Sequence, residues 1–282
     1  MITFSPDEVV DNAPDLWREL LPSLSADTHK YSRGTALVRG GAEMTGASRL
    51  AARAAQRMGA GLVTIAAPAN ALPIYAAAFE SVIVRPSDTL EQWKHLLGDA
   101  RQPAVLIGPG LDVGTDTCNE TIAMLAERRP CVLDAGSLTS FAGNSGELFL
   151  NTHARCVLTP HAGEFVKLFG SLGANDDRVM RARVAAKQSG CVVLLKGSET
   201  VIAAPGGQAV VNRNAPPWLA TAGSGDVLAG MILGLIAQKM PVFWAAAAAT
   251  WFHGRAAILH GAGLIAEDIV EMIPKTLSEN HF

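Results

Sequence analysis

The chain has 282 residues, of which 49% are hydrophobic and 17% are charged, and its formal net charge is −3. This length and composition are typical of a globular protein with one large or two small domains and a substantial core. Because no run of Lys or Arg offers an electrostatic footprint, nucleic acid and anionic membrane surfaces are excluded as partners, which favours a small-molecule ligand.

Local patterns exclude two further classes. Gln238, Lys239 and Pro241 interrupt the longest apolar region, 227–252, so it predicts two buried helices and not a membrane span. The first eight residues have no basic or apolar signal-peptide region, so secretion is not expected. The four cysteines, at 118, 131, 156 and 191, show neither C-x-x-C pairs nor metal-ligand spacing. They are predicted to be reduced core residues in a cytoplasmic protein.

The first third of the chain begins with weakly periodic residues. Residues 1–29 predict a short helix around Ala13–Leu20 and a linker, together an N-terminal extension that packs on the core. A strand is expected at Ala36–Arg39. Thr45 is a plausible N-cap for a helix that runs to Met58 and is closed by Gly59. Leu62–Ala67 is predicted to be the next strand.

From there, short apolar runs alternate with helical segments. The runs are rich in Val and Ile and lack polar alternation, which indicates strands buried on both faces. The predicted strands are Ser81–Arg85, Ala104–Ile107, Cys131–Leu133, Cys156–Leu158 and Val192–Leu195, and the predicted helices are Leu90–Leu97, Thr115–Arg128, Glu164–Phe169 and Asp177–Gln188. The alternation predicts a mostly parallel sheet with helices on both sides, within one domain over 30–282. Val201–Ala204 and Ala209–Asn212 predict an antiparallel hairpin at its edge.

The loops after these strands carry glycines and polar residues. Ligands of parallel α/β sheets bind at the carboxyl ends of the strands. The loops found there are Gly108-Pro109-Gly110, Asp134-Ala135-Gly136, Thr159-Pro160-His161-Ala162-Gly163-Glu164 and Lys196-Gly197-Ser198-Glu199-Thr200. They mark one edge of the sheet as the expected site.

The segment Gly223-Ser224-Gly225-Asp226 opens an apolar helix. A glycine-rich loop at a helix N-terminus presents unpaired N–H groups at the positive end of the dipole, which favours phosphate. The carboxylate of Asp226 would repel phosphate unless it takes up a proton or holds a cation, which suggests a chemical role. The alternative is that Ser224 or Asp226 simply caps the helix.

With these motifs in view, the chain resembles the NAD(P)H-hydrate dehydratase family, a branch of the ribokinase-like superfamily. The likeness runs from about Lys30 to Met272. It rests on the order of the motifs Lys30-Tyr31 with Gly34, Gly41 to Ala47, Gly59 to Val63, Gly108-Pro109-Gly110, Thr159 to Glu164, Lys196-Gly197-x-x-Thr200 and Gly223 to Asp226. It implies a ribokinase-like three-layer α/β/α sandwich with a mostly parallel central sheet and antiparallel edge strands.

The resemblance implies a hydro-lyase that repairs NADH or NADPH hydrated at C6, at the expense of ADP in bacterial members or ATP in eukaryotic ones, with Mg²⁺. Asp226 would be the catalytic base and would touch the hydrate. ADP and its phosphates would contact two segments, Lys196, Gly197, Ser198, Glu199 and Thr200, and Gly223, Ser224 and Gly225. The hydrate, NAD(P)HX, would also contact Ala47, Gly110 and His161. Glu164 would help to hold the metal, directly or through water.

Alternatives remain open for several of these residues. Lys196 could be a solvent-exposed lysine after a strand. His161 could be a helix-opening residue behind Thr159 as N-cap and Pro160 as first helical residue. Ala47 and Gly110 could serve tight packing between helix and sheet.

The resemblance also raises expectations about partners. An NAD(P)H-hydrate epimerase, fused to many bacterial members and not found in this chain, is the expected functional partner. A homo-oligomer, a tetramer by family resemblance, is expected. The rival interpretations are a ribokinase-like kinase of a thiazole or pyrimidine alcohol and a catalytically silent nucleotide-binding module.

Overall fold

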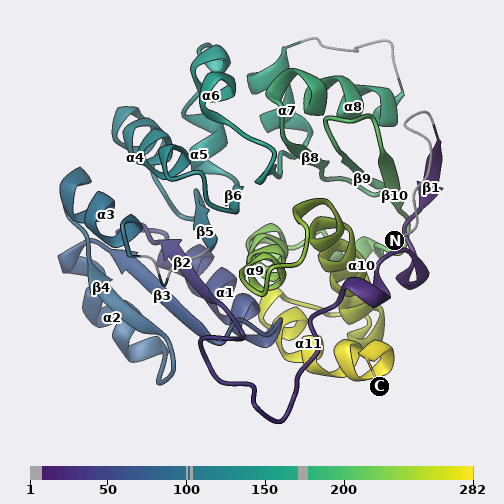
Figure 1. Cartoon of the computed structure of the whole chain (residues 1–282), viewed down its shortest axis with the longest axis horizontal. Helices are drawn as coiled ribbons and strands as arrows, with labels where there is room; N and C mark the ends of the chain where they lie inside the picture. The colour runs from purple at the N-terminus through teal and green to yellow at the C-terminus, as the bar shows by residue number, and fades with distance from the viewer. Residues whose placement is uncertain (1–7, 100, 102–103, 171–176, 282) are drawn as a thin grey trace.

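A ten-stranded sheet forms the centre of the molecule (Figure 1). The computed structural model describes residues 8–99, 101, 104–170 and 177–281. Within them the strand order is β1-β10-β9-β8-β7-β6-β5-β2-β3-β4. The strands are β1 (Val9–Asp11), β2 (Thr35–Arg39), β3 (Leu62–Ala67), β4 (Ile83–Pro86), β5 (Ala104–Ile107), β6 (Cys131–Leu133), β7 (Cys156–Leu158), β8 (Val192–Leu195), β9 (Thr200–Ala203) and β10 (Ala209–Asn212). Only the two pairs that involve β9 are antiparallel.

Helices cover both faces of this sheet and confirm the predicted α/β/α sandwich. Helices α1 (Thr45–Arg57), α2 (Leu72–Ala78), α9 (Ser224–Ala237), α10 (Val242–His260) and α11 (Ala266–His281) enclose one apolar cluster. Helices α3 (Leu90–Leu97), α4 (Thr115–Ala126), α5 (Gly136–Thr139), α6 (Ser145–Asn151), α7 (Ala162–Phe169) and α8 (Arg178–Ser189) enclose the other. Successive strand residues serve opposite clusters: Val38 lies in the first cluster and its neighbour Leu37 in the second. This is why the strands are apolar without alternation.

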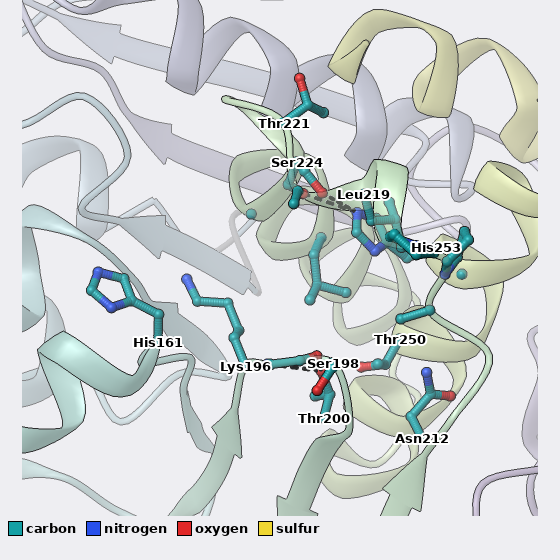
Figure 2. Close-up of a pocket in the computed structure, with 18 residues that line it drawn as sticks. His161, Lys196, Ser198, Thr200, Asn212, Leu219, Thr221, Ser224, Thr250 and His253 are labelled. Atoms are coloured by element: carbon teal, nitrogen blue, oxygen red, sulfur yellow. Dashed lines mark hydrogen bonds between the residues drawn. The ribbon is translucent and has the colours of Figure 1, made fainter. Parts of the chain in front are cut away.

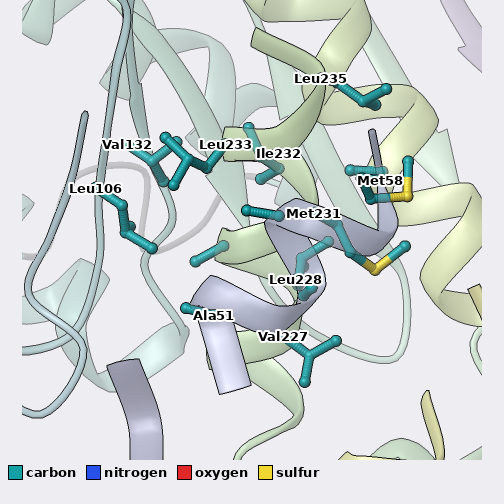
Figure 3. Close-up of a cluster of buried hydrophobic side chains, with 14 of the residues drawn as sticks. Ala51, Met58, Leu106, Val132, Val227, Leu228, Met231, Ile232, Leu233 and Leu235 are labelled. Atoms are coloured by element: carbon teal, nitrogen blue, oxygen red, sulfur yellow. The ribbon is translucent and has the colours of Figure 1, made fainter. Parts of the chain in front are cut away.

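Helix α9 lies at the centre of one layer. Every residue from Val227 to Ala237 is buried, and its side chains pack between α1 and the strands β5 and β6 (Figure 3). The close approach of α1 requires glycine, because a Cβ on Gly230 would lie 2.1 Å from the carbonyl oxygen of Ala51. The packing fixes the N-terminus of α9 against the carboxyl ends of the central strands.

The two predicted helices of the apolar region 227–252 are therefore present as α9 and α10. In the part of the chain that the structure describes, none of the helices is long and apolar enough to cross a membrane.

The N-terminal segment differs from its prediction. In place of an α-helix around Ala13–Leu20 there are two 3₁₀ turns, Pro14–Leu16 and Arg18–Leu20. They are separated by Trp17, whose backbone leaves the helical region at φ −139°. This break lets the Trp17 ring insert beside Trp251 and Phe252, with ring centroids 5.9 and 5.2 Å away. Strand β1 precedes these turns and pairs in parallel with β10 at the edge of the sheet. The sequence did not predict it, because three residues are too few to show a period.

Several element boundaries also shift. Met44, not Thr45, is the N-cap of α1, and α1 ends at Arg57 with Met58 as its C-cap. Gly59 follows with φ +110°, a conformation that favours glycine. The strand predicted at Ser81–Arg85 begins two residues later, at Ile83. Helices α2, α5, α6 and α11 were not predicted; α2 and α6 have seven residues each and α5 has four.

Candidate active site

The glycine-rich loop forms the N-terminus of α9. Gly223 is the N-cap with φ +87°, and a Cβ there would lie 2.7 Å from a methyl carbon of Leu50. Because Gly223 occupies the cap and no side chain accepts a hydrogen bond there, the alternative that Ser224 or Asp226 caps the helix is wrong. Among the described residues, the N–H groups of Gly225 and Asp226 have no acceptor. The loop therefore presents free donors to an anion.

His253 on α10 contacts this loop at Ser224. Its Nε2 lies 3.0 Å from the carbonyl oxygen and 3.1 Å from the hydroxyl of Ser224. Burial lowers the pKa of His253 to about 4, so the ring is neutral at pH 7, and its Nε2–H donates to the Ser224 carbonyl. Sequence reasoning missed His253, although one polar residue after Trp251-Phe252 in an apolar helix is a signal for a buried hydrogen bond.

Lys196 follows β8 and reaches toward the same loop. Its Nζ lies 2.7 Å from Oδ1 of Asp134 and 3.9 Å from Oε2 of Glu164. A Cβ on Gly225 would be 3.5 Å from this Nζ, so the ammonium lies beside the loop. The alternative of a solvent-exposed lysine is wrong. Burial disfavours the charged form, but Asp134, Glu164 and Asp226 outweigh it and raise the pKa of Lys196.

Asp134 is a second residue of this site that the sequence did not single out. It follows β6, its side chain is buried, and its backbone meets the loop after β5. A Cβ on Gly108, where φ is +120°, would lie 1.7 Å from the Asp134 carbonyl oxygen. The next residue, Ala135, has φ +46°, which is strained for a side chain other than glycine. The signal in the sequence was an aspartate directly after an apolar strand.

His161 and Glu164 cap helix α7 reciprocally. Nδ1 of His161 accepts hydrogen bonds from the N–H groups of Gly163 and Glu164 at 2.9 and 3.4 Å, and Glu164 Oε2 accepts one from the His161 N–H at 2.9 Å. His161 is thus the N-cap, and α7 begins at Ala162, so Thr159 is not the cap. Glu164 is buried, but the His161 side chain is 58% exposed and faces the cavity.

Asp226 lies in the first turn of α9, near these charges. Burial, followed by repulsion from Asp134, raises its pKa to about 6, against the attraction of Lys196. Glu164 adds to the repulsion. Three carboxylates thus surround one ammonium, which leaves an excess of negative charge. A carboxyl with a pKa near neutrality can take up and release a proton under ordinary conditions.

A cavity of about 620 Å³ opens between the loops after β8 and β10 and the N-terminus of α9 (Figure 2). Of the residues predicted to bind ADP, most line it: Lys196, Gly197, Ser198, Thr200, Ser224 and Gly225. Glu199 does not, and forms an exposed ion pair with Arg213. Gly223 is the N-cap of α9 and does not line the cavity. His161 lines the same cavity, and so do Asn212, Thr250 and His253, which were not predicted.

The remaining residues predicted to contact the hydrate, Ala47 and Gly110, lie next to each other. A Cβ on Gly110 would be 3.5 Å from the Cβ of Ala47 and 2.4 Å from the Met44 carbonyl oxygen. Gly110 therefore packs closely against the start of α1. A second cavity of about 480 Å³ opens beside this contact and is lined by Gly41 and Leu111 among others. Both the packing alternative and the binding prediction fit this position.

A helix N-terminus with free N–H groups, a partly buried carboxyl group and a lysine lie together at the carboxyl edge of a sheet with the ribokinase-like fold. A profile of the NAD(P)H-hydrate dehydratase family matches residues 35–280. The chain belongs to this family.

Individual relatives agree. The ADP-dependent (S)-NAD(P)H-hydrate dehydratase of Neisseria meningitidis is 36% identical over 249 residues, which cover 85% of this chain and 82% of that protein. The bifunctional NAD(P)H-hydrate repair enzyme of Salinibacter ruber is 40% identical over 96% of this chain but 53% of its own length. The chain thus spans about half the length of the first bifunctional relatives. A Bacillus subtilis ADP/ATP-dependent NAD(P)H-hydrate dehydratase, co-crystallized with ATP/Mg²⁺, has a TM-score of 0.82 at 29% identity and covers 96% of this chain and 99% of its own.

Proposed function

We propose that this protein is an ADP-dependent (6S)-NAD(P)H-hydrate dehydratase. The observation that carries the proposal is the juxtaposition of free N–H donors at Gly225 and Asp226 with a carboxyl whose pKa is about 6. Family membership supports the substrate, and the relatives' names support ADP as phosphoryl donor.

The reaction begins at the C6 hydroxyl of the hydrated ring. Hydroxide is a poor leaving group, so the hydroxyl oxygen attacks the terminal phosphorus of ADP, and AMP departs. Asp226 accepts the hydroxyl proton, a role that contributes roughly 10²- to 10⁴-fold to the rate. Phosphate then leaves C6, a proton leaves C5, and the ring double bond is restored. The products are NAD(P)H, AMP and phosphate.

The loop and Lys196 stabilise the charge that develops on the transferred phosphoryl group. The N–H groups of Gly225 and Asp226 are fixed by the helix, and His253 holds the Ser224 carbonyl in place, so donation needs no reorganisation. We propose that Lys196, Gly197, Ser198 and Thr200 contact ADP within the 620 Å³ cavity. Thr200 shapes this turn by donating to the Gly197 carbonyl at 3.1 Å. Ala47, Gly110 and His161 are proposed to contact the hydrate.

Magnesium fits the chemistry of the site. The excess of carboxylate over ammonium charge, from Asp134, Glu164 and Asp226 against Lys196, favours a hard cation with oxygen ligands. Among the described residues, these carboxylates do not gather within 4.8 Å of one another, so most ligands would be water and phosphate oxygens, with Glu164 acting through water. Mg²⁺ would neutralise phosphate charge as the phosphoryl group is transferred.

The test is a direct assay. Protein is mixed with hydrated NADH, Mg²⁺ and either ADP or ATP, and the near-ultraviolet absorbance of the reduced nicotinamide is followed. We expect an increase that depends on ADP, with AMP and phosphate formed in equal amounts. A stable phosphorylated product from a thiazole or pyrimidine alcohol, with no increase from the hydrate, would overturn the proposal.

The length of the bifunctional relatives supports a functional partner. We propose that an NAD(P)H-hydrate epimerase supplies the substrate epimer, from a separate chain or a fused domain. We also propose a cytoplasmic homo-oligomer in which residues 1–29 form an extension on a single catalytic domain over 30–282. Light scattering of the purified protein measures the oligomeric state.

A further inference from the structure

Three of the four cysteines lie in one row at the amino ends of neighbouring strands. Cys131 and Cys156 are the first residues of β6 and β7 and are paired in register. Val157 pairs with Val192 on β8, so the residue before each, Cys156 and Cys191, continues the row. All three are buried in the same apolar cluster. A row of thiols on one face of three strands is a property of the register, which cysteine spacing in the sequence did not reveal.

His153 completes a cluster at one end of this row. It lies in the connection between α6 and β7, three residues before Cys156. One ligand atom from each of Cys131, His153 and Cys156 lies within 4.8 Å of the others. The Nε2 atom of His153 is buried and has no hydrogen-bond partner, and a buried nitrogen without a partner is costly. The prediction that the cysteines lack metal-ligand spacing overlooked this His-x-x-Cys segment.

We propose that Cys131, Cys156 and His153 form a binding site for a thiophilic metal ion of the Zn²⁺ type. The two sulfur atoms lie 3.5 Å apart, and ligands at the usual Zn–S distance of about 2.3 Å in a tetrahedron have their sulfurs about 3.8 Å apart. The strands therefore hold two ligands near the required separation. The His153 ligand atom lies within 4.8 Å of both sulfurs, whereas nitrogen and sulfur ligands of a tetrahedral Zn²⁺ lie about 3.5 Å apart, so the His153 segment must move closer to complete the site.

One hydrogen bond at Cys156 agrees with a metal-binding thiolate. The His153 backbone N–H points at the Cys156 sulfur at 3.4 Å, and a donor stabilises negative charge on its acceptor. The Cys131 thiol, which donates to the same sulfur at 3.5 Å, would lose its proton to bind the metal. Cys131 and Cys156 are buried, whereas His153 is half-buried. The metal would enter past the imidazole, and water would be the fourth ligand.

This site is distinct from the proposed active site. Its ligands lie at the amino ends of β6 and β7, whereas Asp134 and the His161 turn follow the carboxyl ends of the same strands. The metal would therefore act on the fold, by joining two central strands and the α6–β7 connection, and would take no part in phosphoryl transfer. The inference does not depend on the proposed reaction.

Cobalt(II) is the probe for this proposal, because thiolate ligands give it a charge-transfer band and a tetrahedral site gives it strong visible bands. The full-length protein is reduced, freed of metal with a chelator and titrated with Co²⁺. We expect one ion per chain and displacement of the Co²⁺ spectrum by Zn²⁺. We also expect Zn²⁺ to raise the Tm, because it binds the folded state.

Variants separate this site from other thiols. We expect His153→Ala to weaken Co²⁺ binding by roughly 100-fold or more, since losing a partner that only orients a ligand already costs about 10- to 100-fold. Cys131→Ser should lower the intensity of the charge-transfer band, because only one thiolate ligand remains. Cys118→Ser, on α4, should leave the Co²⁺ spectrum and affinity unchanged. No tetrahedral spectrum in the wild type, unchanged binding by His153→Ala, or a Cys131–Cys156 disulfide in place of metal binding would each overturn the proposal.

Discussion

The two ends of strands β6, β7 and β8 carry different chemistry although the strands have only three or four residues. At about 3.3 Å per residue, roughly 10 Å separates them. The carboxyl ends lead to Asp134, His161 and Lys196, whereas the amino ends carry Cys131, Cys156 and Cys191. The comparison shows how a short parallel strand separates a charged site from a buried thiol cluster.

The difference has a structural cause. At the carboxyl ends, Lys196 lines the cavity beside the N-terminus of α9 and pairs with the buried carboxylate of Asp134. At the amino ends, the thiols are packed in the apolar cluster beneath α6 and α8. Charged groups therefore form an ion pair at one end, and a thiol donates a hydrogen bond to a sulfur at the other. The predictions below test the charged end.

The largest effect is expected from Asp226→Asn. The change removes the proton acceptor but keeps the shape of the first turn, so kcat should fall by about 10²- to 10⁴-fold while ADP affinity changes little. The kinetic measurement is nicotinamide absorbance, and calorimetry measures ADP binding. Asp27→Asn, in an exposed loop, is the matched control. Turnover close to that of the wild type would remove Asp226 as the base.

A smaller effect is expected on the pH profile. Asp226 must be ionised to act as a base, and its pKa is about 6, so kcat/KM should fall as the pH decreases through about 6. Asp134 raises this pKa by repulsion. Asp134→Asn removes the repulsion and releases Lys196 toward Asp226, so the acid limb should move to lower pH.

The measurement for this prediction is kcat/KM against pH for the wild type and Asp134→Asn, with Asp27→Asn as control for the loss of one negative charge. An acid limb that stays in place, or moves to higher pH, would show that repulsion from Asp134 does not raise the pKa of Asp226.

The smallest effect is expected from Ser224→Ala. The hydroxyl contacts His253 at 3.1 Å, but the stronger tie from His253 is to the Ser224 carbonyl, which the variant keeps. The free energy of unfolding should fall by about 0.5–1.5 kcal/mol, and kcat/KM should remain within a few-fold, because the proposed phosphate contacts come from backbone N–H groups. Urea denaturation and the absorbance assay measure the two quantities, with Ser23→Ala, at an exposed position outside helices and strands, as control. A loss of activity as large as that of Asp226→Asn would assign the hydroxyl a direct role.

The sequence was sufficient for the layered sheet. Uninterrupted apolar runs such as Ala104–Ile107 and Val192–Leu195 were located to the residue, because strands buried on both faces have no polar position to blur their ends. It also identified two of the segments that line the cavity, 196–200 and 223–225, since a glycine-rich turn before an apolar helix favours an anion. The short 3₁₀ turns and the outer strand β1 were not predicted from the sequence, because three residues carry no measurable period.

The sequence by itself determined the fold, the family resemblance and the glycine-rich loop, all of which depend on residues that are near one another in the chain. Only the tertiary structure decided the partners that are distant: Asp134 with Lys196, Ser224 with His253, and Cys131 with Cys156. The physical reason is that hydrogen bonding, burial and charge repulsion depend on distance in space. The pKa of Asp226 therefore depends on burial and on Asp134, Lys196 and Glu164. These residues are distant in the sequence and come together only when the sheet forms.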